Sequence, residues 1–404
     1  MIDIEKFLVW INDHKEERPE KLRLRFHGKN VPSWIKDAID HIESYQKSSA
    51  KFITPDNKSF IPSILLPSLS VEQSTSASVA ELHMNILTSH IGGTQGNVLD
   101  MTCGLGMDTR MFAENKFNVT AIEKDKYRYE IAKLNFRDFN NVQLVNEDCR
   151  DFIKKNGRYD AVLIDPARRN ANGSRVYNLH DCEPDVSQLI YDLRGITDYV
   201  MVKLSPMLDL TETLREIPEC SVINVVGNRN ECVELLLEID FTSTKNSMSD
   251  KKIKIYQSPR DAEPFTFFLK ESLNAKPTDY KDIEENSYVY VPSSATMKAG
   301  CFNLISERFR INQISANTHI FSKNHPIDFP LGKSYRVLKS YPFSSSVIKR
   351  FRSEFPHGDV FVRNFGLSAN ELKTRLKLKS SDEIRVMGYQ DKNGKKRLAV
   401  LARC

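Results

Sequence analysis

Short apolar runs alternate with amphipathic stretches through the middle of the chain, from about residue 97 to about residue 270. Strands separated by helices at this interval are typical of a parallel sheet with helices on both faces. The run Ala161–Ile164 is apolar throughout, as expected of a central strand that is buried on both sides. We predict an α/β fold with a doubly wound sheet of seven strands. The strands are expected at Asn97–Met101, Val119–Ile122, Val142–Val145, Ala161–Ile164, Tyr199–Leu204, Ser221–Val226 and Phe265–Leu269.

The residues before this region follow a helical period instead. Ile4, Phe7 and Ile11 recur at intervals of three and four residues, which places them on one face of a helix. A further helix is predicted from residue 77 to about residue 89, before a pair of glycines. We therefore expect a helical N-terminal region over residues 1–90.

The pattern changes again beyond about residue 275. A strand is predicted at Tyr288–Pro292 and a helix over 295–309, and residues 311–334 are expected to be mostly irregular. The chain then predicts a small α+β domain that ends in a hairpin, because its last turn carries Asn393-Gly394. The elements of this domain are expected at Tyr335–Leu338, Ser345–Ser353, Asp359–Arg363, Ala369–Leu378, Glu383–Tyr389 and Lys395–Ala402.

The net charge of +5 is unevenly distributed. Residues 336–404 hold sixteen Lys or Arg against six Asp or Glu, a net charge of +10, so the remaining residues carry −5. This distribution fits two interpretations. One is a solvated, lysine-rich surface, and the other is a basic module that binds a polyanion such as nucleic acid.

Composition narrows the class of protein. Hydrophobic residues make up 40% and charged residues 27%, which is typical of a soluble globular chain. No apolar stretch approaches the ~18 residues of a membrane span, and the N-terminus lacks the pattern of a signal peptide. Seven irregularly spaced cysteines fit reduced thiols. We expect a cytoplasmic protein with no membrane partner and no metal site. The sequence leaves the oligomeric state open.

A glycine-containing segment lies where the first predicted strand turns into a helix. It reads Val98-Leu99-Asp100-Met101-Thr102-Cys103-Gly104-Leu105-Gly106-Met107-Asp108-Thr109. Glycines allow the backbone to approach a ligand closely, and the start of a helix presents free N–H groups to a carboxylate or phosphate. Taken alone, the two glycines fit a tight turn equally well.

Acidic residues at the strand ends favour ligand binding over a simple turn. Asp100 ends the first run, Glu123 ends the second, and Asp148 follows the third. Ligands of such sheets bind at the carboxyl ends of the strands, where a carboxylate can accept hydrogen bonds from both ribose hydroxyls. A nicotinamide-dependent dehydrogenase would share Glu123, but it would usually have a third glycine where Thr109 stands.

The pattern Asp-x-x-Cys-Gly-x-Gly-x-Asp-Thr, together with Asp165-Pro166 after the fourth run, resembles class I S-adenosylmethionine-dependent methyltransferases over roughly residues 70–270. The resemblance implies a Rossmann-like sheet and S-adenosylmethionine as the cofactor. The cofactor-binding candidates are Gln73, Ser74, Asp100, Thr102, Cys103, Gly104, Leu105, Gly106, Asp108, Thr109, Glu123, Lys124, Asp148 and Asp165.

The resemblance also implies a role for each part of this set. Asp100 and the Gly104–Gly106 backbone would hold the methionine part, Glu123 the ribose and Asp148 the adenine. Helix capping is the alternative role for four of the candidates, namely Asp108, Thr109, Gln73 and Ser74.

The catalytic candidates follow the fourth and fifth runs. Class I enzymes that methylate nucleic-acid nitrogens often carry Asp or Asn, two prolines and an aromatic residue after the fourth strand. This chain keeps only Asp165 and Pro166 and continues with Ala167-Arg168-Arg169. Asp165 is expected to orient or deprotonate the methyl acceptor, and Arg168 to contact a substrate phosphate. Lys203 is expected at the same mouth. The structural alternatives are a turn-capping carboxylate, a salt-bridged arginine and a solvated lysine.

The string Asp-Pro-x-Arg also resembles 5-methyluridine methyltransferases, which require a cysteine nucleophile just after the fifth strand. Val202–Met207 contains no cysteine. Cys232 lies one strand later, and ordinary packing is its favoured role.

The whole chain resembles a bacterial family of methyltransferases with a C-terminal THUMP-like domain, preceded by a small ferredoxin-like segment. The segments that carry this resemblance are Leu69–Ser76, Asp165–Arg168, Val202–Pro206, Gly227–Cys232 and Val362–Phe365. It implies a helical N-terminal region (1–90), a methyltransferase domain (91–274), a ferredoxin-like segment (275–331) and a basic THUMP-like domain (332–404).

THUMP domains are RNA-binding modules of tRNA-modifying enzymes, so the resemblance implies a methyltransferase that acts on RNA, either tRNA or rRNA. The basic C-terminal domain would then capture the RNA. Two alternatives stay open: a methyltransferase of a protein or small molecule, and a cofactor-binding, RNA-binding protein without catalysis.

Overall fold

The chain divides into two compact units in the computed structural model. The first unit comprises Met1–Leu208, Glu212–Cys220 and Leu236–Thr244, and the second comprises Asp209–Thr211, Ser221–Leu235 and Lys245–Cys404. The structure describes residues 4–155, 157–167, 179–228, 231–243, 247–277 and 279–404.

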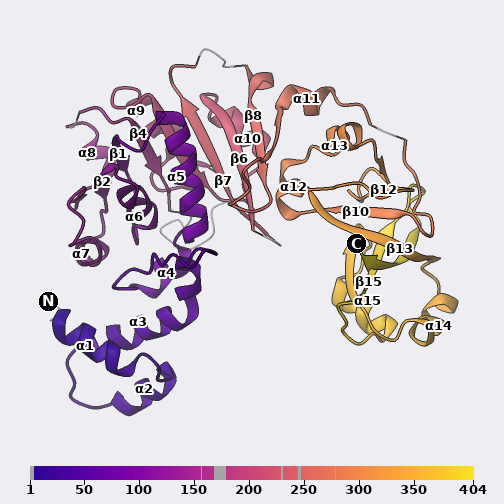
Figure 1. The fold of residues 1–404 in the computed structure, drawn as a ribbon, viewed down its shortest axis with the longest axis horizontal. Coiled ribbons are helices and arrows are strands. Elements are labelled where there is room, and N and C mark those ends of the chain that lie inside the picture. The colour runs from indigo at the N-terminus through magenta and orange to yellow at the C-terminus, as the bar shows by residue number, and fades with distance from the viewer. Residues whose placement is uncertain (1–3, 156, 168–178, 229–230, 244–246, 278) are drawn as a thin grey trace. The chain divides into compact units, whose positions relative to one another are not determined.

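Helices form the start of the first unit, as the helical period predicts (Figure 1). The first three pack around a shared core that contains Phe7, Leu22 and Ile39. Ser76 caps the fifth by accepting a hydrogen bond from the N–H of Val79. The helices of this region are α1 (Ile4–His14), α2 (Pro19–Phe26), α3 (Trp34–Ser48), the 3₁₀ turn η1 (Ser49–Phe52), α4 (Ser68–Gln73) and α5 (Ala77–Ile91).

Five parallel strands of the first unit lie in the order β3-β2-β1-β4-β5. In the central strand β1, Val98 pairs with Val119 of β2 on one side and with Ala161 of β4 on the other. Because the five strands are parallel, their carboxyl ends meet at one edge of the sheet, where ligands of such sheets bind. The strands are β1 (Asn97–Asp100), β2 (Asn118–Ile122), β3 (Val142–Val145), β4 (Ala161–Ile164) and β5 (Tyr199–Leu204).

Helices connect these strands, and α5 packs against the first of them (Figure 1). The connecting elements are α6 (Met107–Glu114), α7 (Lys126–Asn135), α8 (Cys149–Phe152), the 3₁₀ turn η2 (Leu179–Asp181), α9 (Val186–Leu193) and α10 (Leu210–Glu216). This alternation of strand and helix confirms the predicted α/β class.

The sheet has nine strands where the sequence predicts seven, in the order β3-β2-β1-β4-β5-β7-β6-β8-β9. The sequence does not predict two of these strands, β7 (Glu231–Asp240) and β8 (Lys252–Tyr256). β6 (Cys220–Asn228) is parallel to β8, and β9 (Phe265–Phe268) ends the sheet as an antiparallel edge strand. The 3₁₀ turn η3 (Met248–Asp250) precedes β8, and α11 (Leu269–Asn274) follows β9.

A second sheet of seven strands fills the rest of the second unit, in the order β11-β12-β10-β13-β16-β15-β14. Its strands are β10 (Tyr288–Pro292), β11 (Asn312–Gln313), β12 (Phe321–Lys323), β13 (Gly332–Pro342), β14 (Asp359–Arg363), β15 (Ile384–Gln390) and β16 (Lys396–Arg403). The region 311–334 thus contains two short strands that the sequence does not predict. The helix expected over 295–309 is two helices, α12 (Ser294–Ala299) and α13 (Phe302–Phe309), with a break at Gly300.

The two faces of this sheet bury different cores. One contains Ile314, Ile320 and Met387 with Phe361 packed against it. The other is covered by α14 (Ser345–Glu354) and α15 (Ala369–Leu376), which pack on Val386 and Val400. A capping box begins α15, since Ser368 and Glu371 bond reciprocally.

None of the described helices combines the length and the apolar character that crossing a membrane requires.

Candidate active site

Asp100 closes β1 at the carboxyl edge of the sheet and is almost completely buried, with 2% of its surface exposed. Its Oδ1 accepts a hydrogen bond from the N–H of Thr102 at 3.1 Å, and its Oδ2 accepts one from the Thr109 hydroxyl at 2.6 Å. Burial, reinforced by the nearby charge of Asp108, raises the pKa of Asp100 to about 7. Thr109 therefore holds Asp100 rather than capping the helix.

The glycine loop is tied to the end of β2 through Glu123. The N–H of Gly104 donates to Glu123 Oε2 at 3.1 Å, and the N–H of Asp125 donates to Oε1 at 2.9 Å. Gly106 has a φ of +81°, and a Cβ built there would lie 2.4 Å from the ring of Phe136. A residue without a side chain is therefore required at this position. Leu105 and Cys103 are buried in the loop.

The carboxylate of Asp148 is engaged by its own neighbour. Arg150 donates to it through Nε at 2.9 Å and through a terminal guanidinium nitrogen at 2.7 Å. This pairing lowers the pKa of Asp148 to about 2. The exposed side chain of Lys124 forms an ion pair with Glu183 at 3.1 Å. Contact of Asp148 or Lys124 with a ligand would thus compete with these pairs.

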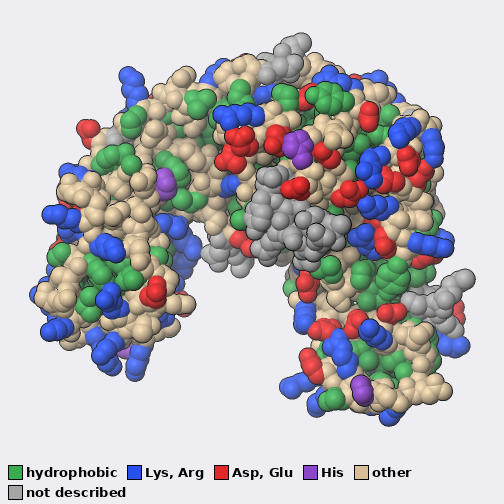
Figure 2. Space-filling model, turned by 180° about the vertical axis from the view of Figure 1, so that it is seen from behind, with side chains coloured by type: hydrophobic (Ala, Val, Ile, Leu, Met, Phe, Trp, Pro, Cys, Tyr) green, Lys and Arg blue, Asp and Glu red, His purple; other side chains and the backbone are tan. Residues whose placement is uncertain are grey.

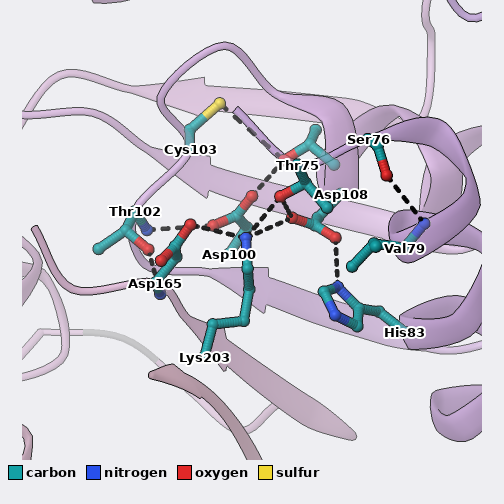
Figure 3. Close-up of polar contacts among 11 residues, drawn as sticks. Thr75, Ser76, Val79, His83, Asp100, Thr102, Cys103, Asp108, Asp165 and Lys203 are labelled. Atoms are coloured by element: carbon teal, nitrogen blue, oxygen red, sulfur yellow. Dashed lines mark hydrogen bonds and ion pairs between the residues drawn. The ribbon is translucent and has the colours of Figure 1, made fainter. Parts of the chain in front are cut away.

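Asp108 is the centre of a buried polar cluster next to the loop (Figure 3). Its Oδ1 lies 2.7 Å from Nδ1 of His83 on α5, and its Oδ2 accepts from the hydroxyl of Thr75 at 2.9 Å and from Lys203 at 3.2 Å. Burial alone would raise the pKa of Asp108, but the charges of Lys203 and His83 hold it well below the ordinary value. Asp108 is therefore an internal counter-charge and does not cap α6.

Lys203 joins this cluster to Asp165. Its Nζ donates to Asp165 Oδ2 at 2.6 Å and to the Thr75 hydroxyl at 2.5 Å. The side chain of Lys203 is only 3% exposed, so the alternative of a solvated lysine is wrong. The side chain of Asp165 is 32% exposed and remains accessible.

The backbone around Asp165 is fixed from two sides. Its N–H donates to the Thr102 hydroxyl of the glycine loop at 2.7 Å. Pro166 is buried, and Ala167 forms a short antiparallel bridge with the backbone of Glu183. Arg168 lies outside the described residues.

The segment before α5 contributes the side chain of Thr75, whose neighbours Gln73 and Ser74 are the candidates named from the sequence. Thr75 reaches Asp108 and Lys203, whereas the Ser74 hydroxyl donates to the carbonyl of Val71 and Gln73 is exposed. The helix cap is supplied by Ser76.

His83 is the residue that sequence reasoning missed. It is completely buried on α5, and its partner Asp108 is 25 positions further along the chain. The available signal was its spacing from Ala80 and Leu87, which puts a histidine on the apolar face of the helix.

The cysteines favour packing roles. Burial raises the pKa of the Cys232 thiol to about 11, so it is protonated at neutral pH. Burial also raises the pKa of Cys103 well above its usual value. Within the part of the chain that the structure describes, no group of three or more His, Cys, Asp or Glu residues is arranged to hold a metal ion.

Three family models match the chain. A methyltransferase domain matches residues 98–172, a ferredoxin-like domain matches 288–330, and a THUMP domain-like model matches 332–404. The first match covers the glycine loop, Glu123, Asp148 and Asp165.

Individual relatives agree with these models. A Mycobacterium tuberculosis protein named an S-adenosylmethionine-dependent methyltransferase is 24% identical over 323 residues, 78% of this chain and 82% of the relative. A Mycoplasma mobile protein named an RNA methyltransferase is 31% identical over 119 residues, 29% of this chain and 30% of the relative.

A solved structure matches over the whole chain. It is the crystal structure of a protein described as a methyltransferase from Porphyromonas gingivalis W83, with a TM-score of 0.87 and 25% identity, and the match covers 100% of this chain and 99% of that one. The chain is therefore a methyltransferase of the S-adenosylmethionine-dependent class, with a THUMP-like domain at its C-terminal end.

Proposed function

We propose that this methyltransferase acts on RNA, with the donor bound at the glycine loop and the RNA captured by the basic C-terminal domain. The observation that carries the proposal is the combination of buried carboxylates at the carboxyl ends of β1 and β2 with the net charge of +10 on residues 336–404.

The residues at the glycine loop suit S-adenosylmethionine. This donor supplies an electrophilic methyl group on a positively charged sulfur. Asp100 and the Gly104–Gly106 backbone would hold its methionine part, and Glu123, already oriented by two backbone N–H groups, would accept hydrogen bonds from the ribose. Asp148 would bind the adenine after one of its hydrogen bonds from Arg150 breaks.

Asp165 is the group that faces the methyl acceptor in this proposal. Lys203 donates a hydrogen bond to one of its carboxylate oxygens, which fixes the orientation of the side chain. A carboxylate held in this way can orient an acceptor or take its proton, and placing the acceptor in line with the methyl group supplies most of the catalysis.

The exposed cations of the C-terminal domain are the proposed RNA-binding surface. α14 and α15 lie side by side on one face of the sheet. Their exposed cations and those of the last hairpin are Lys349, Arg350, Arg352, Arg375, Lys377, Lys379, Lys392, Lys395 and Lys396. Lys and Arg side chains are scattered over the lobe at the lower left of Figure 2, which this domain forms, among uncharged side chains. Such contacts to phosphates position RNA without reading its sequence.

Two relationships support RNA over other acceptors. The C-terminal domain is THUMP-like, and one relative, which matches over 119 residues, is named an RNA methyltransferase.

A labelling experiment tests the proposal. Purified protein receives S-adenosylmethionine with a tritiated methyl group and total RNA from cells that lack its gene, with Asp165→Ala in parallel. We expect label that RNase removes and that the variant fails to incorporate, although it still binds the donor. Label that persists after RNase treatment, or donor binding without any RNA labelling, would contradict an RNA acceptor.

A further inference from the structure

Arg363 is a half-buried cation at the end of β14 without a protein partner. Its Nε is fully buried and unpaired, and within the described ranges the guanidinium makes no hydrogen bond or ion pair. Burial lowers its pKa, so its surroundings disfavour the charge that it carries. A cation withdrawn from water without a counter-charge is costly. The position is therefore suited to an anion supplied from outside the chain.

The register of the sheet shows what surrounds Arg363. It pairs with Tyr389 of β15 and lies on the same face as Phe361, two residues earlier. Phe361 packs against the core that contains Ile314 and Ile320. Arg363 thus lies on the face that the segment 314–320 covers.

That segment brings a second unpartnered polar group, His319. Its Nδ1 is buried and makes no hydrogen bond among the described residues, while its ring stacks on Phe302 with centroids 4.0 Å apart. The backbone of His319 has a φ of +52°, a conformation that a histidine keeps only when its surroundings enforce it. Besides burial, the charge of Arg363 lowers the pKa of His319, which places the two groups within electrostatic reach.

Gln390, at the end of β15, holds both segments. Its carbonyl accepts a hydrogen bond from the Thr318 hydroxyl at 2.8 Å, and its side-chain oxygen accepts one from the Asn364 amide at 2.7 Å. The residues next to His319 and next to Arg363 are thus bonded to the same glutamine. The arrangement is fixed before any ligand arrives.

We infer that Arg363 and His319 form a binding site for one phosphate group of the RNA substrate, with Gln390 as the positioning residue. The inference rests on the proposed RNA function and specifies two residues of the chain that would bind the RNA. The planar guanidinium can donate two parallel hydrogen bonds to phosphate oxygens, and an imidazole N–H can donate another. The site differs from the surface of α14 and α15 because both donor side chains are partly buried and their neighbours in the chain are hydrogen-bonded to Gln390.

Binding of fluorescently labelled bulk tRNA and rRNA fragments to the full-length chain tests this site. The variants are Arg363→Gln, Arg363→Lys and the matched control Arg403→Gln, which removes the same charge from an exposed position in the same sheet. We expect R363Q to weaken binding about ten-fold and to lower the salt dependence by about one phosphate contact. We expect R403Q to change affinity less than about three-fold.

Each outcome separates this site from the broader proposal. Equal losses in R363Q and R403Q would overturn the built site and leave RNA binding intact. Absence of RNA binding by the unaltered protein, at low as well as physiological salt, would overturn the RNA function and this site with it. If R363Q fails to fold, the R363K variant provides the test. Lysine keeps the positive charge but lacks the two parallel donors of the guanidinium, so R363K should still weaken binding about three-fold. Unchanged affinity of R363K would refute the site.

Discussion

The ammonium group of Lys203 lies 3.2 Å from the carboxylate of Asp108, and both side chains are more than nine-tenths buried. Lys203 lies near the end of β5, and Asp108 belongs to the first turn of α6. This ion pair therefore fixes a helix to a strand that lies 95 residues later in the chain. It also orients the same lysine toward Asp165. The orientation of Asp165, the candidate catalytic carboxylate, therefore depends on the buried ion pair between Lys203 and Asp108.

Replacement of Lys203 by methionine should destabilise the fold by about 3–5 kcal/mol, because Asp108 would stay buried after losing its ion pair with Lys203, with His83 left beside it. The double variant K203M/D108N should lose less than the sum of the single losses. Denaturant unfolding measures all three. Lys124→Met is the matched control, since its pair with Glu183 is exposed and should contribute at most about 1 kcal/mol. Additive losses would show that Lys203 and Asp108 do not interact.

The raised pKa of Asp100 has a predictable effect on stability. The folded state keeps its proton up to about pH 7, while the unfolded chain releases it near pH 4. The contribution of Asp100 to the free energy of unfolding should therefore fall as pH rises from about 4 to about 7 and stay constant above.

His41 changes stability in the opposite direction over much of this range, because burial lowers its pKa to about 4. The informative quantity is thus the difference between the unaltered protein and Asp100→Asn, measured by denaturant unfolding at several pH values. The variant should gain relative stability as pH rises. A difference that does not vary with pH would contradict a buried, protonated Asp100.

Donor binding should respond to the same proton. Deprotonated Asp100 suits a positively charged ligand, so the affinity for S-adenosylmethionine should increase as pH rises through about 7. Calorimetry in buffers of different ionisation enthalpy should detect proton release on binding, and D100N should release less. Affinity that is independent of pH, without proton release, would argue against this contact.

Alanine substitutions at two glycines of positive φ allow the cost of backbone strain to be distinguished from the cost of side-chain crowding. Gly92 has open space around its missing Cβ, whereas at Gly106 the ring of Phe136 occupies that space. Gly92→Ala should cost about 1–2 kcal/mol, the strain alone. Gly106→Ala should cost about 2–4 kcal/mol and also weaken donor binding, because Phe136 must move. Thermal unfolding and donor titration compare them. Equal costs would mean that the loop accommodates a methyl group.

The basic surface can be tested by charge removal. The triple variant Arg350→Gln, Arg352→Gln and Arg375→Gln should lower kcat/KM for RNA about ten-fold and reduce its salt dependence, with donor affinity unchanged. A matched control removes three exposed charges from the helical N-terminal region, at Lys21, Lys29 and Lys36. Equal effects of the two sets would indicate a general attraction by net charge and no specific RNA surface.

Much of the fold followed from local patterns. The central strands are continuous apolar runs, and their carboxyl ends carry Asp100, Glu123 and Asp165, so topology alone brings these three acids to one edge. β7 was hidden because Glu231, Glu234 and Glu238 recur at a spacing that equally fits a helix.

The cluster beneath the loop could not be predicted in the same way. A lysine at the end of a strand has the same local pattern whether it is solvated or buried, and only the tertiary contacts of Lys203 distinguish the two. His83 needed the packing of α5 against α6, a long-range contact that no sequence period encodes.

The hydroxyl of Thr102 belongs to the glycine loop, yet it accepts the hydrogen bond that fixes the backbone of Asp165. In the proposed function, a displacement of this loop on donor binding would therefore be transmitted to the carboxylate of Asp165. The two substrates then become thermodynamically linked, and each raises or lowers the affinity of the other by the same factor. A single threonine would thus couple the affinities of the two substrates.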